Sequence, residues 1–399
     1  MDRKRQLLYL IICFPLLLLT GCWDRVELND RALWLATGFD AVKGEKGIEV
    51  SGQIAVPSNM KPSGSSGGGG GVGGGMPEPY FVLSQKGNNV GDALSEMETE
   101  LSRSPDFGQR HVIFLGEEFA KKGLRYMLDS NTREPDINIR SDIFVVKGGT
   151  AKDILNGAAG FELTPAISAI KKHEQYGGRG DISYLEFLIA SHKKGMNPTI
   201  PALRIDAKGT SKPLTKVAGL AIFDKDLKLL GFIDADEKRD FLWILGDLKR
   251  RTVAIQYKEG GNASLNLVNI SHKIIPEIRK DSPIKFTITL GGDAEIFENN
   301  TDLDLVPRKN LKILERAFEQ HLEKQVLQTV HKVQKEYGVD IFGLGEVIHL
   351  KQPQQWKSLK KDWNSKFKEA EVVVKVNLTI KSNGLSGPSL LVEESEIKK

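Results

Sequence analysis

Hydrophobic positions follow two periods along this chain, and together they predict a mixed architecture of helices and sheets. Apolar and polar residues alternate over 285–290, as in a strand with one face in water. Residues 309–337 instead carry apolar side chains at helical spacing, so this helix should pack on a sheet. We expect strands at 34–42, 48–56, 80–85, 111–115, 142–146, 217–223, 227–233, 253–257, 264–273, 284–291 and 371–380. We expect helices at 89–103, 119–128, 150–159, 165–176, 182–192, 236–248, 309–337 and 354–367.

Two stretches interrupt these periods. The segment 62–79 is of low complexity, with glycine and serine filling almost all of 64–75, and it cannot bury enough apolar surface to offset its backbone entropy. We expect a flexible loop there, and it lacks the Lys-Ser or Lys-Thr that follows a phosphate-binding glycine loop. The segment 197–213 is rich in proline, glycine and polar residues and is typical of a domain boundary.

The first 21 residues have the layout of a bacterial lipoprotein signal peptide. Basic residues 3–5 precede an apolar stretch, 7–19, that is shorter than the ~20 residues of a membrane-spanning helix and contains Pro15. The thiol of Cys22 would receive an S-diacylglycerol group, and its amino group an N-acyl chain. A plain secretory signal with an incidental cysteine is the alternative. The residues that a signal peptidase would recognise are Leu19, Thr20 and Gly21.

Cysteine content and charge exclude several classes of function. Cys13 would leave with the signal peptide and Cys22 would become a thioether, so the mature chain would have no free thiol, disulfide or cysteine metal ligand. A formal net charge of +4 over 399 residues does not indicate a nucleic-acid-binding protein. The local basic clusters could contact anionic lipid headgroups or simply be solvated. They lie at 171–172, 192–194, 249–251 and 357–361.

The residue patterns of known active sites are missing, so we expect neither an enzyme nor a bound metal or cofactor. Seven histidines are scattered without the His-Glu-x-x-His spacing of zinc hydrolases. The carboxylate pairs 117–118 and 236–237 fall at predicted helix starts, where the helix dipole favours negative charge. Residues 168–171 and 191–194 match Ser-x-x-Lys, but the Lys-Thr-Gly partner of penicillin-interacting enzymes is missing.

Five stretches, in order along the chain, resemble the Ger(x)C family of spore germination lipoproteins, the C subunits of germinant receptors. They are 21–29, 112–117, 218–223 with 230–231, 340–346, and Pro353 with the two following tryptophans. Trp356 and Trp363 are seven residues apart, so we expect both on one helix face in the core, with ligand stacking as the alternative. The family-motif residues, expected to be structural, are Trp23, Asp24, Glu27, Gly116, Glu117, Gly343, Gly345, Trp356 and Trp363.

The resemblance implies an α+β fold with three domains of mixed α/β layers, in which sheets pack against helices. It implies a non-enzymatic subunit, lipid-anchored on the outer face of the spore inner membrane, that works with two integral membrane subunits of a nutrient receptor. Whether it binds a small-molecule germinant stays open, and a solute-binding lipoprotein or a cell-wall enzyme are the alternatives. The expected limits are signal peptide 1–21, N-terminal domain 22–200 with loop 62–79, middle domain 201–278, C-terminal domain 279–385 and polar tail 386–399.

Overall fold

The computed structural model describes most of the chain beyond its N-terminus. The described residues are 30–60, 78–133, 137–176, 183–206, 214–257, 261–280, 282–382, 388–389 and 397. In this part of the chain, no helix is long and apolar enough to span a membrane. The glycine-rich segment and most of the polar tail lie outside the described residues, and so do the expected signal-peptidase and anchor residues Leu19, Thr20, Gly21, Cys22, Trp23, Asp24 and Glu27.

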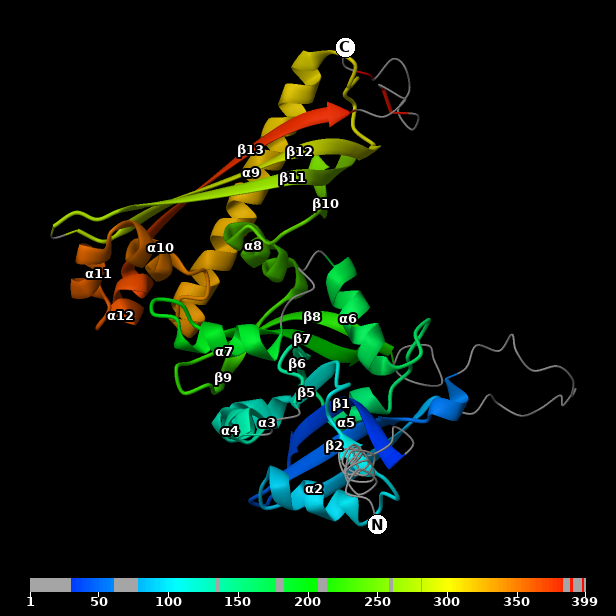
Figure 1. The fold of residues 1–399 in the computed structure, drawn as a ribbon. Helices are drawn as coiled ribbons and strands as arrows, with labels where there is room; N and C mark the ends of the chain where they lie inside the picture. The colour runs from blue at the N-terminus through cyan, green and yellow to red at the C-terminus, as the bar shows by residue number, and fades with distance from the viewer. Residues whose placement is uncertain are drawn as a thin grey trace, which may run out of the picture.

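A nine-stranded mixed sheet forms the N-terminal half (Figure 1), with strand order β3-β2-β1-β5-β6-β7-β8-β9 and β4 paired to β1. Strands β1, β5, β6 and β7 run parallel, whereas β2, β3, β8 and β9 join through antiparallel pairs. The strands are β1 (Arg31–Ala41), β2 (Ile48–Ala55), β3 (Tyr80–Gly87), β4 (Ser104–Asp106), β5 (Val112–Gly116), β6 (Asp142–Val146), β7 (Thr199–Asp206), β8 (Leu214–Phe223) and β9 (Leu229–Ile233).

Helices cover both faces of this sheet, which explains why its central strands are apolar at nearly every position. Alternate residues of β5 enter two different cores: Ile113 packs on one face and Phe114 on the other. We name this sheet with its six helices the N-lobe. The helices are α2 (Val90–Glu98), α3 (Glu117–Lys122), α4 (Arg125–Arg133), α5 (Ala151–Leu155), α6 (Pro165–Gln175) and α7 (Tyr184–His192).

A four-stranded sheet, in the order β10-β11-β12-β13, and a long helix dominate the C-terminal half, which we name the C-lobe. The strands are β10 (Arg251–Tyr257), β11 (Gly261–Glu277), β12 (Lys285–Asn299) and β13 (Glu371–Ser382). The helices are α9 (Arg308–Lys332), extended by the π-helical turn η3 (Val333–Tyr337), then α10 (Leu344–Lys351), α11 (Pro353–Leu359) and α12 (Trp363–Glu369). Helix α8 (Ala235–Leu245) lies between the two lobes (Figure 1).

The long helix packs as its apolar stripe predicts, with Leu314, Phe318 and Val326 fully buried. Its carboxylates also cover an edge of the sheet, because backbone N–H groups on the free side of β13 donate to them. The bonds run from Val376 to Glu323 at 2.9 Å, from Leu378 to Glu319 at 2.8 Å and from Ile380 to Glu315 at 2.8 Å. Helix α9 thereby satisfies donors that an open edge strand would leave exposed.

The predicted α+β class is confirmed, as are most of the predicted strands, but four expected helices differ. The helix expected at 150–159 ends at Leu155. The helix expected at 89–103 ends at Glu98, and β4 follows it. The helix expected at 119–128 is two helices, because Gly123 adopts a φ of +106° that ends α3. The helix expected at 354–367 is interrupted by a turn after Leu359, so α11 and α12 are separate.

The segment 197–213, where the sequence suggested a boundary, contains β7, which pairs with β6 and β8 inside the sheet. A hydrophobic core then continues from Leu220 of β8 and Ile233 of β9 through Trp243 of α8 to Phe286 of β12. One of the hydrophobic cores therefore extends across both lobes. The limits of the three expected domains stay a prediction.

Candidate functional site

Three family-motif residues, Gly345, Trp356 and Trp363, meet where the lobes touch, around Gly195, which follows α7 of the N-lobe. A Cβ on Gly345 would lie 2.7 Å from the carbonyl oxygen of Gly195 and 2.7 Å from the indole of Trp363. Gly195 itself has a φ of +81°, and a Cβ there would lie 2.6 Å from the ring of Trp356. We name Gly195, Asp340, Gly345, Trp356 and Trp363 the joint. Its two glycines permit an approach that any side chain would block.

The tryptophans of the joint are core residues, as expected, but they lie on different helices. Trp356 of α11 is 2% exposed and Trp363 of α12 is 5% exposed. Their rings meet edge to face, with centroids 5.4 Å apart and an interplanar angle of 68°. Aromatic pairs in this geometry contribute roughly 0.5–1.5 kcal/mol beyond their buried area.

A fully buried carboxylate, Asp340, organises the joint. It accepts hydrogen bonds from the backbone N–H of Gly345 at 2.8 Å and from the indole N–H of Trp363 at 3.1 Å. Its backbone carbonyl also accepts a 2.6 Å bond from the N–H of Asn197 in the N-lobe. Burial raises the pKa of Asp340 to about 6, although these donors favour its ionised form. Nearby, Gly343 begins α10 with a φ of +70°, which suits glycine.

The motif residues Gly116 and Glu117 lie elsewhere, at the end of β5 in the N-lobe. A Cβ on Gly116 would collide with Oδ1 of Asp40. The Asp40 carboxylate accepts the N–H groups of Ala151 at 2.8 Å and Lys152 at 3.0 Å, at the start of α5. Burial raises the pKa of Asp40 to about 6 against the effect of these bonds. Gly116 thus leaves room for the carboxylate that holds α5 on the sheet.

The side chain of Glu117 fixes the loop before α5. It accepts the N–H of Gly148 at 2.7 Å and pairs with Lys121 at 2.8 Å. Partial burial opposes ionisation of Glu117, but the bonds from Lys121 and Gly148 outweigh it and lower its pKa. The geometry of Gly116 and Glu117 agrees with a structural role for both.

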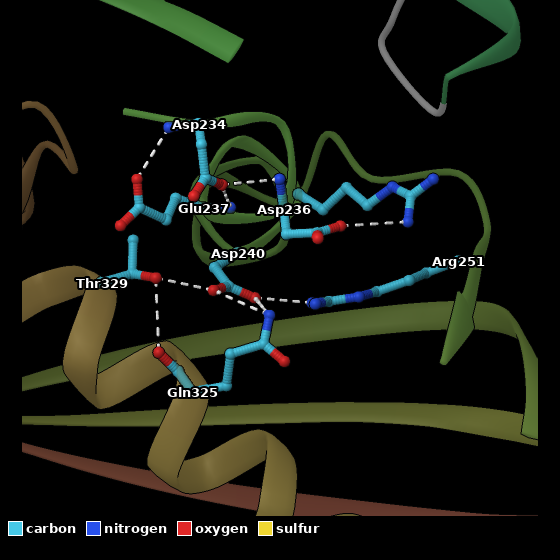
Figure 2. A network of polar contacts seen from close by, with 8 residues as sticks. Asp234, Asp236, Glu237, Asp240, Arg251, Gln325 and Thr329 are labelled. Atoms are coloured by element: carbon cyan, nitrogen blue, oxygen red, sulfur yellow. Dashed lines mark hydrogen bonds and ion pairs between the residues drawn. The ribbon is translucent and has the colours of Figure 1, made fainter. Parts of the chain in front are cut away.

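A buried ion pair connects α8 with the C-lobe (Figure 2). Asp240 of α8 pairs with Arg251 of β10 at 2.6 Å, and both side chains are almost inaccessible to solvent. Thr329 of α9 donates a 2.7 Å bond to the same carboxylate, and Gln325 lies at 3.3 Å. Burial raises the pKa of Asp240, while Arg251 and Thr329 oppose that shift. Such a pair positions elements rather than adding much net stability.

The carboxylates that begin α8 are capping groups, as the sequence predicts. Asp234 accepts the N–H groups of Asp236 and Glu237, both at 2.9 Å, and Glu237 accepts the N–H of Asp234 at 2.7 Å (Figure 2). This reciprocal arrangement satisfies donors that the first helical turn leaves unpaired. Glu237 is therefore a capping residue, whereas the Asp236 carboxylate accepts a bond from Arg239 at 3.4 Å.

The same helix also contacts the N-lobe through two buried side chains. Nζ of Lys238 lies 2.8 Å from Nδ1 of His173 on α6. Burial lowers the pKa of Lys238 to about 7. The preceding residue, Glu237, pairs with Lys332 of α9 at 2.8 Å. Helix α8 is thus tied by polar contacts to both lobes.

The Ser-x-x-Lys matches do not form serine–lysine dyads. Ser168 is buried, while the ammonium of Lys171 pairs with Glu162 at 2.7 Å. Ser191 donates its hydroxyl to the carbonyl of Leu188 at 2.7 Å, and Lys194 is exposed. Over the described residues, no group of three or more His, Cys, Asp or Glu side chains could hold a metal ion.

Several residues that build these sites have little local signature. Asp40 was detectable in principle, because an acid inside an otherwise apolar strand must find buried donors. Gly195 looks like any glycine after a helix. Asp240 follows Arg239 in a polar helix start and looks solvated. Only the packing of distant segments gives these residues their roles.

Each half of the chain matches the model of a known protein family. Residues 24–205 match the family model of the spore germination protein N-terminal domain. Residues 218–384 match that of the spore germination B3/GerAC-like C-terminal domain.

Individual proteins match over nearly the whole chain. Spore germination protein KC of Bacillus subtilis (strain 168) is 27% identical over 402 residues, covering 96% of this chain and 97% of its own. Spore germination protein A3 of the same organism is 24% identical over 390 residues, covering 96% of this chain and 99% of its own. The crystal structure of the GerBC protein aligns with a TM-score of 0.55 at 20% identity, over 86% of this chain and 96% of that one, and supports the fold.

Proposed function

We propose a function from one premise: this chain belongs to the GerAC-like family of spore germination proteins, whose two domain models it matches in order. The protein is a non-enzymatic, lipid-anchored subunit of a nutrient germinant receptor. It assembles with membrane-embedded receptor subunits on the extracytoplasmic face, in the spore inner membrane. The observation that carries this proposal is the match over nearly the full length to proteins named for spore germination.

The short distance from the expected anchor supports the proposal. Only residues 23–30 lie between Cys22 and the first strand, which begins at Arg31. Even fully extended, this stretch reaches about 30 Å. Lipid on Cys22 would therefore hold the N-lobe beside the bilayer. Confinement there raises the effective concentration of receptor subunits, so modest interfaces suffice for assembly.

The rigid connection between the lobes supports a role in transmitting a movement from one receptor partner to another. The shared core and the contacts of α8 link the lobes through buried groups, among them Asp240 and Lys238. Bending at this boundary would expose apolar surface and strip buried polar groups of their partners, which costs several kcal/mol. In the proposed receptor, a partner that moves the C-lobe would move the anchored N-lobe with it.

The anchor is tested by replacing Cys22 with Ala and measuring both the membrane fraction of the protein and nutrient germination. Cys13→Ala is the matched control, because Cys13 lies inside the expected signal peptide. We expect Cys22→Ala to release the protein from membranes and to impair germination, and Cys13→Ala to do neither. Unchanged membrane retention of Cys22→Ala would remove the anchor from the proposal.

Assembly is tested separately, by cross-linking the protein in spore membranes and identifying the proteins captured. We expect multi-span receptor subunits, and we expect deletion of the gene to abolish the response to at least one nutrient. An unaltered response, with no paralogue compensating, would contradict the receptor role. A strong thermal shift of the isolated chain with nutrients would favour a solute-binding lipoprotein instead.

A further inference from the structure

The outer surface of the joint contains a cleft with a volume of about 730 Å³, within the size range of ligand pockets. Trp356 and Trp363 of the C-lobe line it, and so do residues 193–197, which follow α7 of the N-lobe. The cleft thus lies between the lobes, where Lys193 and Lys194 of one basic cluster meet Lys360 and Lys361 of another, far apart in sequence.

Five lysines line this cleft, whereas Asp362 is its single acidic lining residue. Lysines 193 and 194 come from the N-lobe, Lys225 from the turn between β8 and β9, and lysines 360 and 361 from the turn between α11 and α12. Among the described residues, the ammonium groups of 193, 194, 360 and 361 have no carboxylate within ion-pair distance. Five ammonium groups outnumber the one carboxylate that lines the cleft, so a bound anion would stabilise this arrangement.

Two further observations distinguish the cleft from an ordinary flexible surface. Lys225 donates to the backbone carbonyls of Lys193 and Met196, which fixes the N-lobe wall, and burial lowers the pKa of its ammonium. The indole N–H of Trp356, a cleft residue, is buried and has no acceptor among the described residues. An indole N–H can only donate, so this group is left without a protein partner beside the cleft.

We propose that this cleft binds a phosphate group. Separate ammonium groups on flexible stems suit a tetrahedral anion with several acceptor oxygens, whereas planar carboxylates are matched better by arginine forks, which the cleft lacks. The source is a phospholipid headgroup or a free phosphate ester. This site depends neither on the lipid anchor nor on receptor assembly.

The test uses the full-length Cys22→Ala chain, so that acylation cannot hold the protein on a vesicle. One arm measures calorimetric binding of glycerol 3-phosphate, with succinate as a dianion lacking tetrahedral geometry. The other measures sedimentation with phosphatidylglycerol vesicles against phosphatidylcholine vesicles. Both arms compare Lys360→Gln/Lys361→Gln with Lys357→Gln/Lys366→Gln, which removes the same charge from exposed positions on α11 and α12 outside the cleft.

We expect Lys360→Gln/Lys361→Gln to weaken binding at least about tenfold and the control pair to change it little, because charged hydrogen bonds are lost only in the first variant. Binding to glycerol 3-phosphate identifies a free phosphate ester, and binding to phosphatidylglycerol vesicles alone identifies a headgroup. The proposal fails if neither probe binds, if succinate binds as tightly, or if both variants lose binding equally. Thermal unfolding of both variants shows that each is folded.

Discussion

The rings of Trp356 and Trp363 meet edge to face with centroids 5.4 Å apart, although the two residues lie on different helices. Seven residues of uninterrupted helix would separate them by about 10 Å along the axis. The turn after Leu359 separates α11 from α12, and Trp356 packs against Gly195 while Trp363 packs against Gly345. This turn also places lysines 360 and 361 at the mouth of the cleft.

Gly345→Ala should destabilise the protein by about 1–3 kcal/mol, because its Cβ would overlap the Gly195 carbonyl and the Trp363 ring. Gly91→Ala is the matched control. It lies inside α2 with only one side-chain atom nearby, at 3.4 Å, so alanine should be neutral or slightly stabilising. Urea unfolding of both variants checks this, and equal stabilities would contradict the tight approach at the joint.

Gly116→Ala should be destabilising because of Asp40, and the two positions should be coupled. Asp40→Ala alone removes acceptors from the N–H groups of Ala151 and Lys152, at a cost of about 1–3 kcal/mol. In the double variant the collision is gone, so its loss of stability should be clearly smaller than the sum of the single losses. A double-mutant cycle by chemical denaturation measures the coupling, and simple additivity would contradict it.

The two buried carboxylates should make stability depend on pH. Asp340 and Asp40 have folded pKa values of about 6, above the usual value near 3.8. Each therefore binds its proton more tightly when folded, so its contribution is fully present below about pH 4 and is lost as pH rises through 6. The loss is of the order of 3 kcal/mol per group.

Asp340→Asn keeps one oxygen acceptor but cannot ionise, so this variant should show a smaller fall in stability between pH 4 and pH 6 than the parent chain. Urea unfolding across that window measures the difference, and the comparison cancels other titrating groups. Asp362→Asn, at an exposed position, should leave the profile unchanged. Identical slopes for Asp340→Asn and the parent chain would contradict the raised pKa.

Removing one partner of the buried pair between Asp240 and Arg251 should destabilise the protein strongly. Replacing both with apolar residues should destabilise it much less. Arg251→Met leaves an uncompensated carboxylate and should destabilise by about 3–5 kcal/mol. Asp240→Leu with Arg251→Met should recover most of that loss, since paired removal leaves no buried charge. Denaturation midpoints of the two variants test this, and a double variant no more stable than Arg251→Met would show that the network supplies net stability.

Local sequence was sufficient for much of the fold. Alternation and helical spacing placed most strands and the buried stripe of α9, because side-chain periods of two and 3.6 residues determine which face meets the core. Asp236 and Glu237 were recognisable as helix-start residues, because helix capping depends on neighbours within four residues. The motif stretches also carried the family resemblance.

The tertiary structure alone decided which residues from distant segments meet. Gly195 meets Gly345, Asp40 meets Gly116, and Asp240 meets Thr329 only after segments dozens of residues apart have packed. These contacts depend on backbone approach and burial, which leave no period in the sequence. For the same reason, two basic clusters that separately look like solvated surface become one lysine-lined cleft, because the turn after Leu359 brings them to the same joint.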